Sequence, residues 1–178
     1  MAVIVVSGNG RNVGKTTLVC ALIEALPEYR WTAVKISAHE HQAHQPIWKE
    51  TAPGEGSDTA RFLAAGAERA FLVTAAGNEV ANRVAKLLGD RAPAWDWIFE
   101  SNRVLDALEP DLCLAVSGPE ETALKPSFAR AQQRADAWLR RGARNRVLGG
   151  TPMGFEVKDL GTLPRPLRQW VRARLGCG

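Results

Sequence analysis

The chain is poor in cysteine, and no apolar run in it approaches the length of a membrane-spanning helix. Its three cysteines, Cys20, Cys113 and Cys177, show no paired spacing, which argues against a disulfide framework and favours reducing conditions. The first apolar segment is short and lacks the basic flank of a signal peptide. We therefore expect a cytoplasmic protein with no membrane partner.

Acidic residues are scarce after Lys125, although the whole chain has a formal net charge of only +4. A surface for nucleic acid or an acidic partner is one interpretation of this charge, and a solvated basic face is the other. No aromatic interleaving accompanies the charge, so we do not expect nucleic acid as a partner. The basic residues of this last third include Arg140, Arg141, Arg144, Arg146, Arg165, Arg168, Arg172 and Arg174.

The order of the apolar segments predicts an α/β fold, because β-branched runs alternate with segments of helical periodicity. We expect strands at residues 3–6, 31–36, 69–74, 95–99, 111–116 and 135–139, and helices at 15–25, 58–65, 78–88, 101–108, 126–134 and 164–175. This alternation implies a three-layer sandwich with a mostly parallel sheet. The length suits a single domain over residues 1–178.

Residues 8–17 read GNGRNVGKTT and follow the apolar run at residues 2–6 after a single serine, Ser7. A strand, a glycine-rich turn, Gly-Lys-Thr and an apolar helix, in that order, indicate a phosphate-binding loop, or P-loop. With the mostly parallel sheet, this motif predicts the P-loop NTPase fold and a single P-loop nucleotide-binding domain over residues 1–178. Loop N–H groups, the helix N-terminus and Lys15 can surround the terminal phosphates of a nucleotide. The expected nucleotide-binding residues are Gly8, Asn9, Gly10, Arg11, Asn12, Val13, Gly14, Lys15, Thr16 and Thr17.

Two acidic residues are candidates to complete a Mg²⁺ site with the Thr16 hydroxyl. Glu100 follows an apolar strand, where P-loop proteins place a carboxylate, and with Lys15 it is also our candidate catalytic group. Asp58 opens a helix after a long polar loop, and a plain helix-dipole role for it stays open. Asp96 is the alternative acid.

All three histidines lie close together, at His39, His41 and His44. Three interpretations stay open: a polar loop without a site, a phosphate or substrate contact through His39 and His41, and a structural metal. Lys35, at the end of the second strand, points to the same sheet edge as either a phosphate-facing or a solvated cation. An Asn-Lys-x-Asp guanine motif is absent, so the base, GTP or ATP, stays open.

The chain resembles the molybdopterin-guanine dinucleotide biosynthesis adaptor protein B family over its first hundred residues. The similarity lies in Gly-Lys-Thr-Thr at residues 14–17, Val-Lys at 34–35 before the histidines, and Gly-Ser-Asp-Thr-Ala-Arg at 56–61 leading to Ala-Gly-Ala at 65–67. The longer loop, with five residues between Gly8 and Gly14, resembles dethiobiotin synthetase.

The resemblance implies a Mg²⁺-dependent nucleotide-binding protein. The adaptor family implies a weak GTPase that assists molybdenum cofactor assembly with a partner protein. The synthetases imply an ATP-dependent ligase or kinase-like enzyme instead. A homodimer is compatible with either expectation.

Overall fold

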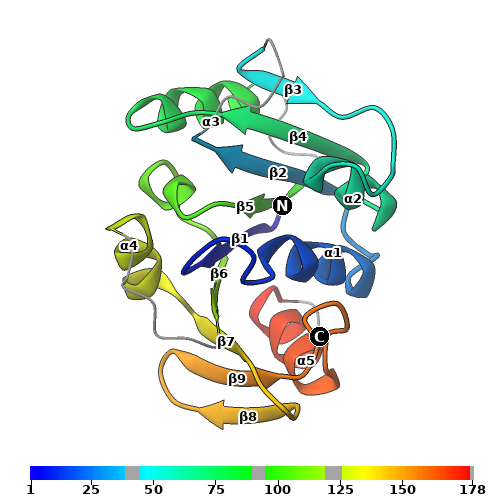
Figure 1. The fold of residues 1–178 in the computed structure, drawn as a ribbon, viewed down its shortest axis with the longest axis vertical. Helices are drawn as coiled ribbons and strands as arrows, with labels where there is room; N and C mark the ends of the chain where they lie inside the picture. Colours follow the sequence, from blue (N-terminus) through cyan, green and yellow to red (C-terminus); the bar gives the residue numbers. More distant parts are fainter. Residues whose placement is uncertain (39–44, 90–94, 119–125, 177–178) are drawn as a thin grey trace.

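A nine-stranded sheet runs through the middle of the molecule in the strand order β3-β4-β2-β5-β1-β6-β7-β9-β8 (Figure 1). The computed structural model describes residues 1–38, 45–89, 95–118 and 126–176. The strands are β1 (Val3–Gly8), β2 (Trp31–Ser37), β3 (Ile47–Lys49), β4 (Arg69–Thr74), β5 (Asp96–Glu100), β6 (Leu112–Ser117), β7 (Ala137–Arg141), β8 (Arg146–Gly149) and β9 (Met153–Val157). The inner seven strands pair in parallel, whereas β3 and β8 are antiparallel edge strands.

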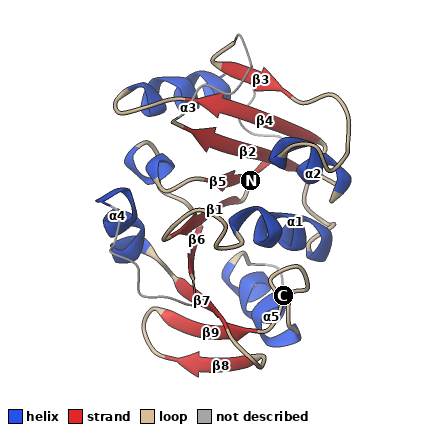
Figure 2. Ribbon diagram, in the orientation of Figure 1, coloured by secondary structure: helices blue, strands red, loops and turns tan. Residues whose placement is uncertain are grey.

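Helices cover both faces of this sheet and make three layers (Figure 2). On one face lie α1 (Lys15–Ala25), α2 (Asp58–Ala64) and α5 (Arg165–Arg174), and on the other lie α3 (Glu79–Gly89), α4 (Pro126–Arg134) and the 3₁₀ helix η2 (Arg103–Asp106). Each face has its own apolar core, represented by Leu22 of α1 and by Val84 of α3.

The central strand β1 explains the near-continuous apolar run in the sequence. Ile4 and Val6 point into the core under α1, whereas Val5 points into the core on the α3 and α4 side. All three side chains are fully buried. A strand covered on both faces has no solvent side, so it loses the alternation of polar and apolar residues.

The α/β fold with a mostly parallel sheet is confirmed, but several predicted elements are wrong. Residues 47–49, expected within a loop, form β3, and the helix expected at 101–108 is reduced to the 3₁₀ turn η2. The strand expected at 135–139 lies at Ala137–Arg141, and β8 and β9 were not predicted. Within the described residues, none of the helices has both the length and the apolar character needed to cross a bilayer.

Candidate phosphate-binding site

The glycine-rich loop lies at the carboxyl edge of the sheet, between the end of β1 and the start of α1 (Figure 1). β1 sits between β5 and β6, so the ends of both neighbouring strands flank the loop. The Asn9 N–H donates to the Val116 carbonyl at 3.1 Å, which extends the β1–β6 pairing into the loop. This edge of an open parallel sheet is where such folds bind ligands.

Glycine is required at two turns of the loop. Gly10 and Gly14 have φ angles of 135° and 100°, which side-chain-bearing residues rarely adopt. A Cβ atom added to Gly14 would also lie 2.5 Å from Leu160 Cδ1. The backbone conformation therefore requires glycine at these two positions. The same conformation allows the N–H groups of the loop to point toward one bound anion.

Lys15, the first residue of α1, folds back across the loop. Its ammonium donates to the Gly10 carbonyl at 2.6 Å. The first turn of α1 has no acidic residue, and its N-cap residue Gly14 makes no side-chain capping bond. The positive end of the helix dipole and the Lys15 ammonium thus lie together, an arrangement that favours an anion.

Thr16 and Glu100 form the next part of the site. The Thr16 hydroxyl donates to Glu100 Oε2 at 2.7 Å. Glu100 is the last residue of β5, and only 2% of its side chain is exposed. A carboxylate this deeply buried needs polar partners, because leaving it unpaired away from water is costly.

Lys35 supplies the second partner of Glu100. The β2–β5 register places Lys35 directly opposite Glu100, and its ammonium bonds the free carboxylate oxygen, Oε1. The same ammonium lies 2.9 Å from Oδ2 of Asp58, at the start of α2. Lys35 therefore bridges the two carboxylates that the sequence assigned to a metal.

The charges in this cluster stabilise one another. Burial opposes ionisation of Asp58, but the hydrogen bond and positive charge of Lys35 hold the pKa of that carboxyl below its ordinary value. For Lys35, burial opposes the charged form, but the Glu100 and Asp58 carboxylates together outweigh it and raise the pKa of the ammonium. At neutral pH the site therefore holds a protonated Lys35 and an ionised Asp58.

The donor atoms fit a magnesium ion. Thr16, Asp58 and Glu100 offer one hydroxyl and two carboxylates, the hard oxygen ligands that Mg²⁺ takes beside waters and phosphate oxygens. Lys35 competes for both carboxylates. A divalent cation bound to both carboxylates would therefore displace the Lys35 ammonium. An anion bound at the glycine-rich loop would attract the displaced ammonium.

Asn102 is a site residue that the sequence analysis missed. Its side-chain amide makes two hydrogen bonds with the backbone of Gly8: Oδ1 accepts from the Gly8 N–H at 2.8 Å, and Nδ2 donates to the Gly8 carbonyl at 3.1 Å. The amide thus replaces a strand neighbour where β5 has ended. The sequence feature that could have identified Asn102 is its position two residues after the predicted metal ligand Glu100.

The segment after β9 is the second missed contribution. Leu160 lies against Gly14, and Gly161 lies close to Thr17, so this segment packs on the start of α1. Asp159 holds the turn by accepting a hydrogen bond from the Gly161 N–H at 2.8 Å. No periodic pattern marked this region, because β8 and β9 are short and partly exposed.

Other candidates lie elsewhere. Asp96, the alternative metal ligand, is at the opposite end of β5, where it accepts hydrogen bonds from the Ala2 and Arg30 N–H groups. Arg140, one of the basic residues of the last third of the chain, donates to Glu156 at 3.2 Å. His39, His41 and His44 lie outside the described residues.

The fold and loop together define an α/β protein with the fold of P-loop NTPases. No family model matches the chain, and no curated protein sequence matches it. Among solved structures, the chain is similar to an "apo" form of LpxK from Aquifex aeolicus, crystallised in complex with ATP, with a TM-score of 0.56 and 16% identity. The similarity covers 79% of this chain and 48% of that one, so it spans about half of the LpxK structure. At this identity the similarity concerns the fold.

Proposed function

We propose that this protein binds a purine nucleoside triphosphate with Mg²⁺ and cleaves it slowly. The observation that carries the proposal is the convergence of Lys15, Thr16, Asp58 and Glu100 at the N-terminus of α1. These groups come from α1, α2 and β5, which are distant in the sequence. Their types match the cation, hydroxyl and acids that phosphoryl chemistry uses.

Each group has a distinct role in this proposal. The loop N–H groups and Lys15 bind the β- and γ-phosphates. Thr16, Asp58 and Glu100 hold Mg²⁺ directly or through water, and a bound Mg²⁺ would neutralise charge on the phosphate oxygens. Lys35, released from its carboxylates, turns its ammonium to the γ-phosphate.

Slow turnover follows from the state of the two acids. In the proposed complex Asp58 and Glu100 both hold Mg²⁺, so neither is poised as a general base for water. A nucleotide-dependent adaptor needs only such slow hydrolysis. The resemblance to the adaptor proteins therefore supports a role in molybdenum cofactor assembly, with a partner protein that responds to the bound nucleotide.

Transfer to a small acceptor is the second candidate. Lys35 brings a second ammonium to the site beside Lys15, and two cations can neutralise the charge on a phosphoryl group in the transition state of its transfer. The ATP in the LpxK complex and the resemblance to dethiobiotin synthetase support ATP over GTP for this alternative. An ATP-dependent kinase or ligase reaction would then replace hydrolysis.

Phosphate release from ATP and GTP, measured with and without Mg²⁺, tests the proposal. We expect turnover below about one per minute, loss of it in EDTA, and loss of it in Lys15→Ala. Lys49→Ala, which removes an exposed cation on the other sheet face, serves as the matched control. Turnover that persists in EDTA or in Lys15→Ala contradicts the proposal, and faster turnover argues against a passive adaptor.

A further inference from the structure

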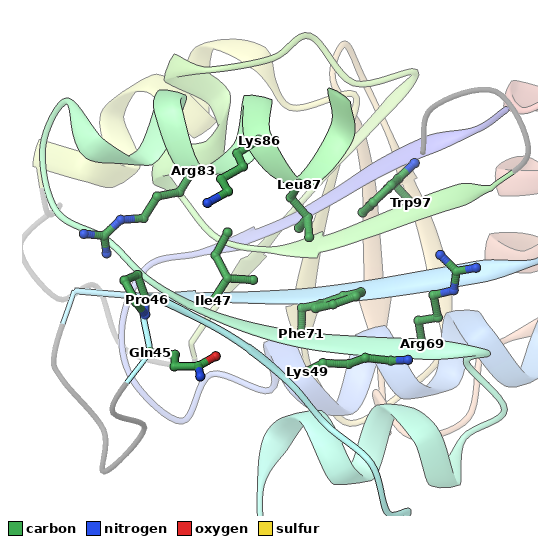
Figure 3. Close-up of a pocket in the computed structure, with 10 residues that line it drawn as sticks. All are labelled: Gln45, Pro46, Ile47, Lys49, Arg69, Phe71, Arg83, Lys86, Leu87 and Trp97. Atoms are coloured by element: carbon green, nitrogen blue, oxygen red, sulfur yellow. The ribbon is translucent and has the colours of Figure 1, made fainter. Parts of the chain in front are cut away.

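A pocket of about 560 Å³ lies between α3 and strands β3, β4 and β5 (Figure 3). Its size falls within the range of small-molecule sites. Its described lining residues are Gln45, Pro46, Ile47, Lys49, Arg69, Phe71, Arg83, Lys86, Leu87 and Trp97. None of these belongs to the candidate phosphate-binding site.

The strand register explains the apolar floor of this pocket. Antiparallel pairing of β3 with β4 places Ile47 opposite Val73 and Lys49 opposite Phe71, all on the face that α3 covers. Leu87 of α3 packs on the same core. Because β3 has only three residues, α3 and the sheet edge do not close completely, and a trough remains between them.

Four cations surround this floor. In Figure 3, Arg83 and Lys86 lie toward one end of the pocket and Arg69 and Lys49 toward the other, with Ile47, Phe71 and Leu87 between the two pairs. No aspartate or glutamate is among the described lining residues. The walls therefore concentrate positive charge around an apolar surface, which raises the local concentration of anions.

Among the described residues, the acids nearest in sequence pair mainly outside the pocket or make an exposed ion pair with it. Glu50 accepts hydrogen bonds from Ser57 and Thr59, on the α2 side. Glu68 pairs with Arg30 and also interacts, more weakly, with the charge of Arg69. Glu79 touches the lining through an ion pair of 3.0 Å with Arg83, in which the Glu79 side chain is 60% exposed. Such exposed pairs within a helix are weak and exchange readily.

The two lysines of the lining, Lys49 and Lys86, make no ion pair with any described residue. Both are exposed. Arg69 stacks on Trp95 with its guanidinium carbon 3.6 Å from the ring centroid, which orients the guanidinium. Charge-assisted hydrogen bonds from these groups suit carboxylate, sulfonate or phosphate oxygens.

We propose that this pocket binds a small organic anion with a flat apolar body. The apolar side chains contact the body, and the cations at the ends bind its acidic groups. The site is separate from the phosphate loop, because Lys35 and Asp58 lie on the α1 and α2 face of the sheet and Phe71 lies on the opposite face. The proposal therefore does not depend on nucleotide binding.

A pair of fluorescent probes tests it. The probe 8-anilinonaphthalene-1-sulfonate has a flat apolar body and one anionic group, and N-phenyl-1-naphthylamine is its neutral counterpart. We expect the sulfonate to bind the native protein one to one, with a dissociation constant of roughly 100 µM or tighter. The neutral probe should bind at least about tenfold more weakly, and added salt should weaken only the sulfonate.

Variants then locate the probe. Arg83→Gln with Lys86→Gln should weaken sulfonate binding about tenfold or more, since each removes a charge-assisted contact. Leu87→Glu, which places a carboxylate on the half-buried floor, should abolish it. Arg168→Gln, an exposed cation on α5 across the sheet, is the matched control and should bind as the unaltered protein does.

Circular dichroism of each variant confirms that the fold is retained. Excess ATP with Mg²⁺ should leave sulfonate binding unchanged. Absence of sulfonate binding, equal binding of the neutral probe, insensitivity to both sets of substitutions, or displacement by ATP would each overturn the proposal. Displacement by ATP would place the anion at the phosphate loop, whereas the other outcomes leave the proposed nucleotide function intact.

Discussion

Thr16 and Glu100, which are 84 residues apart in the chain, meet through a hydrogen bond of 2.7 Å. The contact exists because β1 and β5 pair in parallel, with Val6 opposite Glu100, so the end of β5 reaches the first turn of α1. Glu100 also carries the Lys35 ammonium on its other oxygen. Any ligand that takes the Thr16 hydroxyl is therefore coupled to Lys35 and, through it, to α2.

Asn102→Ala should destabilise the protein by about 1–3 kcal/mol, because it leaves both backbone groups of Gly8 without their amide partner. Urea unfolding followed by circular dichroism measures this change. Asn82→Ala, at an exposed position of α3, is the matched control and should change stability by less than about 0.5 kcal/mol. Equal stability of Asn102→Ala and the unaltered protein would show that the amide does not hold the loop.

Lys35→Met should cost about 3 kcal/mol of unfolding free energy, because Glu100 stays buried and loses its counter-charge. Adding Glu100→Gln to Lys35→Met should recover a large part of the loss, since no unpaired charge then remains. Denaturant unfolding of the single and double variants gives both values. If the double variant is less stable than Lys35→Met, Glu100 has a stabilising role that does not depend on Lys35.

Cys20, on α1, should react slowly with iodoacetamide. Burial raises the pKa of its thiol to about 11, despite the opposing charge of Arg61. Because the thiolate is the reactive form, the rate at pH 8 should be roughly 100-fold below that of an exposed cysteine. It should rise about tenfold per pH unit up to pH 10.

Mass spectrometry of a Cys177→Ser variant separates the remaining thiols. Cys113 is fully buried, and burial raises the pKa of its thiol to about 12, so it should react only after unfolding. A reaction rate for Cys20 that levels off near pH 9 would contradict the buried environment described for this face of α1.

The sequence predicted the strands that carry a strong signal. β1, β2, β4 and β6 are buried runs of apolar residues, and burial on both faces makes such runs visible. The edges of the sheet gave weaker signals. β3 follows Pro46 and has three residues, and β8 ends at Gly149, so turn-forming residues mask both strands.

The candidate site was predictable to the extent that residue type reveals chemistry. Lys15, Thr16, Asp58 and Glu100 were selected because a phosphate and a magnesium ion require such groups, and the sheet topology brings them together. Asn102 was not selected, because an amide that bonds a backbone has no periodic or compositional signature. The bridging position of Lys35 depends on strand register, which a single sequence does not specify.

Thermal unfolding with ATP or GTP and Mg²⁺, for the unaltered protein and for Lys15→Ala, tests the phosphate loop most directly. At a nucleotide concentration of about 100 times the dissociation constant, we expect Tm to rise by about 5–10 °C in the unaltered protein and in Lys49→Ala. Lys15→Ala should show no rise. Nucleotide binding at this loop would be contradicted if neither nucleotide raises the Tm of the unaltered protein. It would also be contradicted if Lys15→Ala shows the same rise in Tm as the unaltered protein.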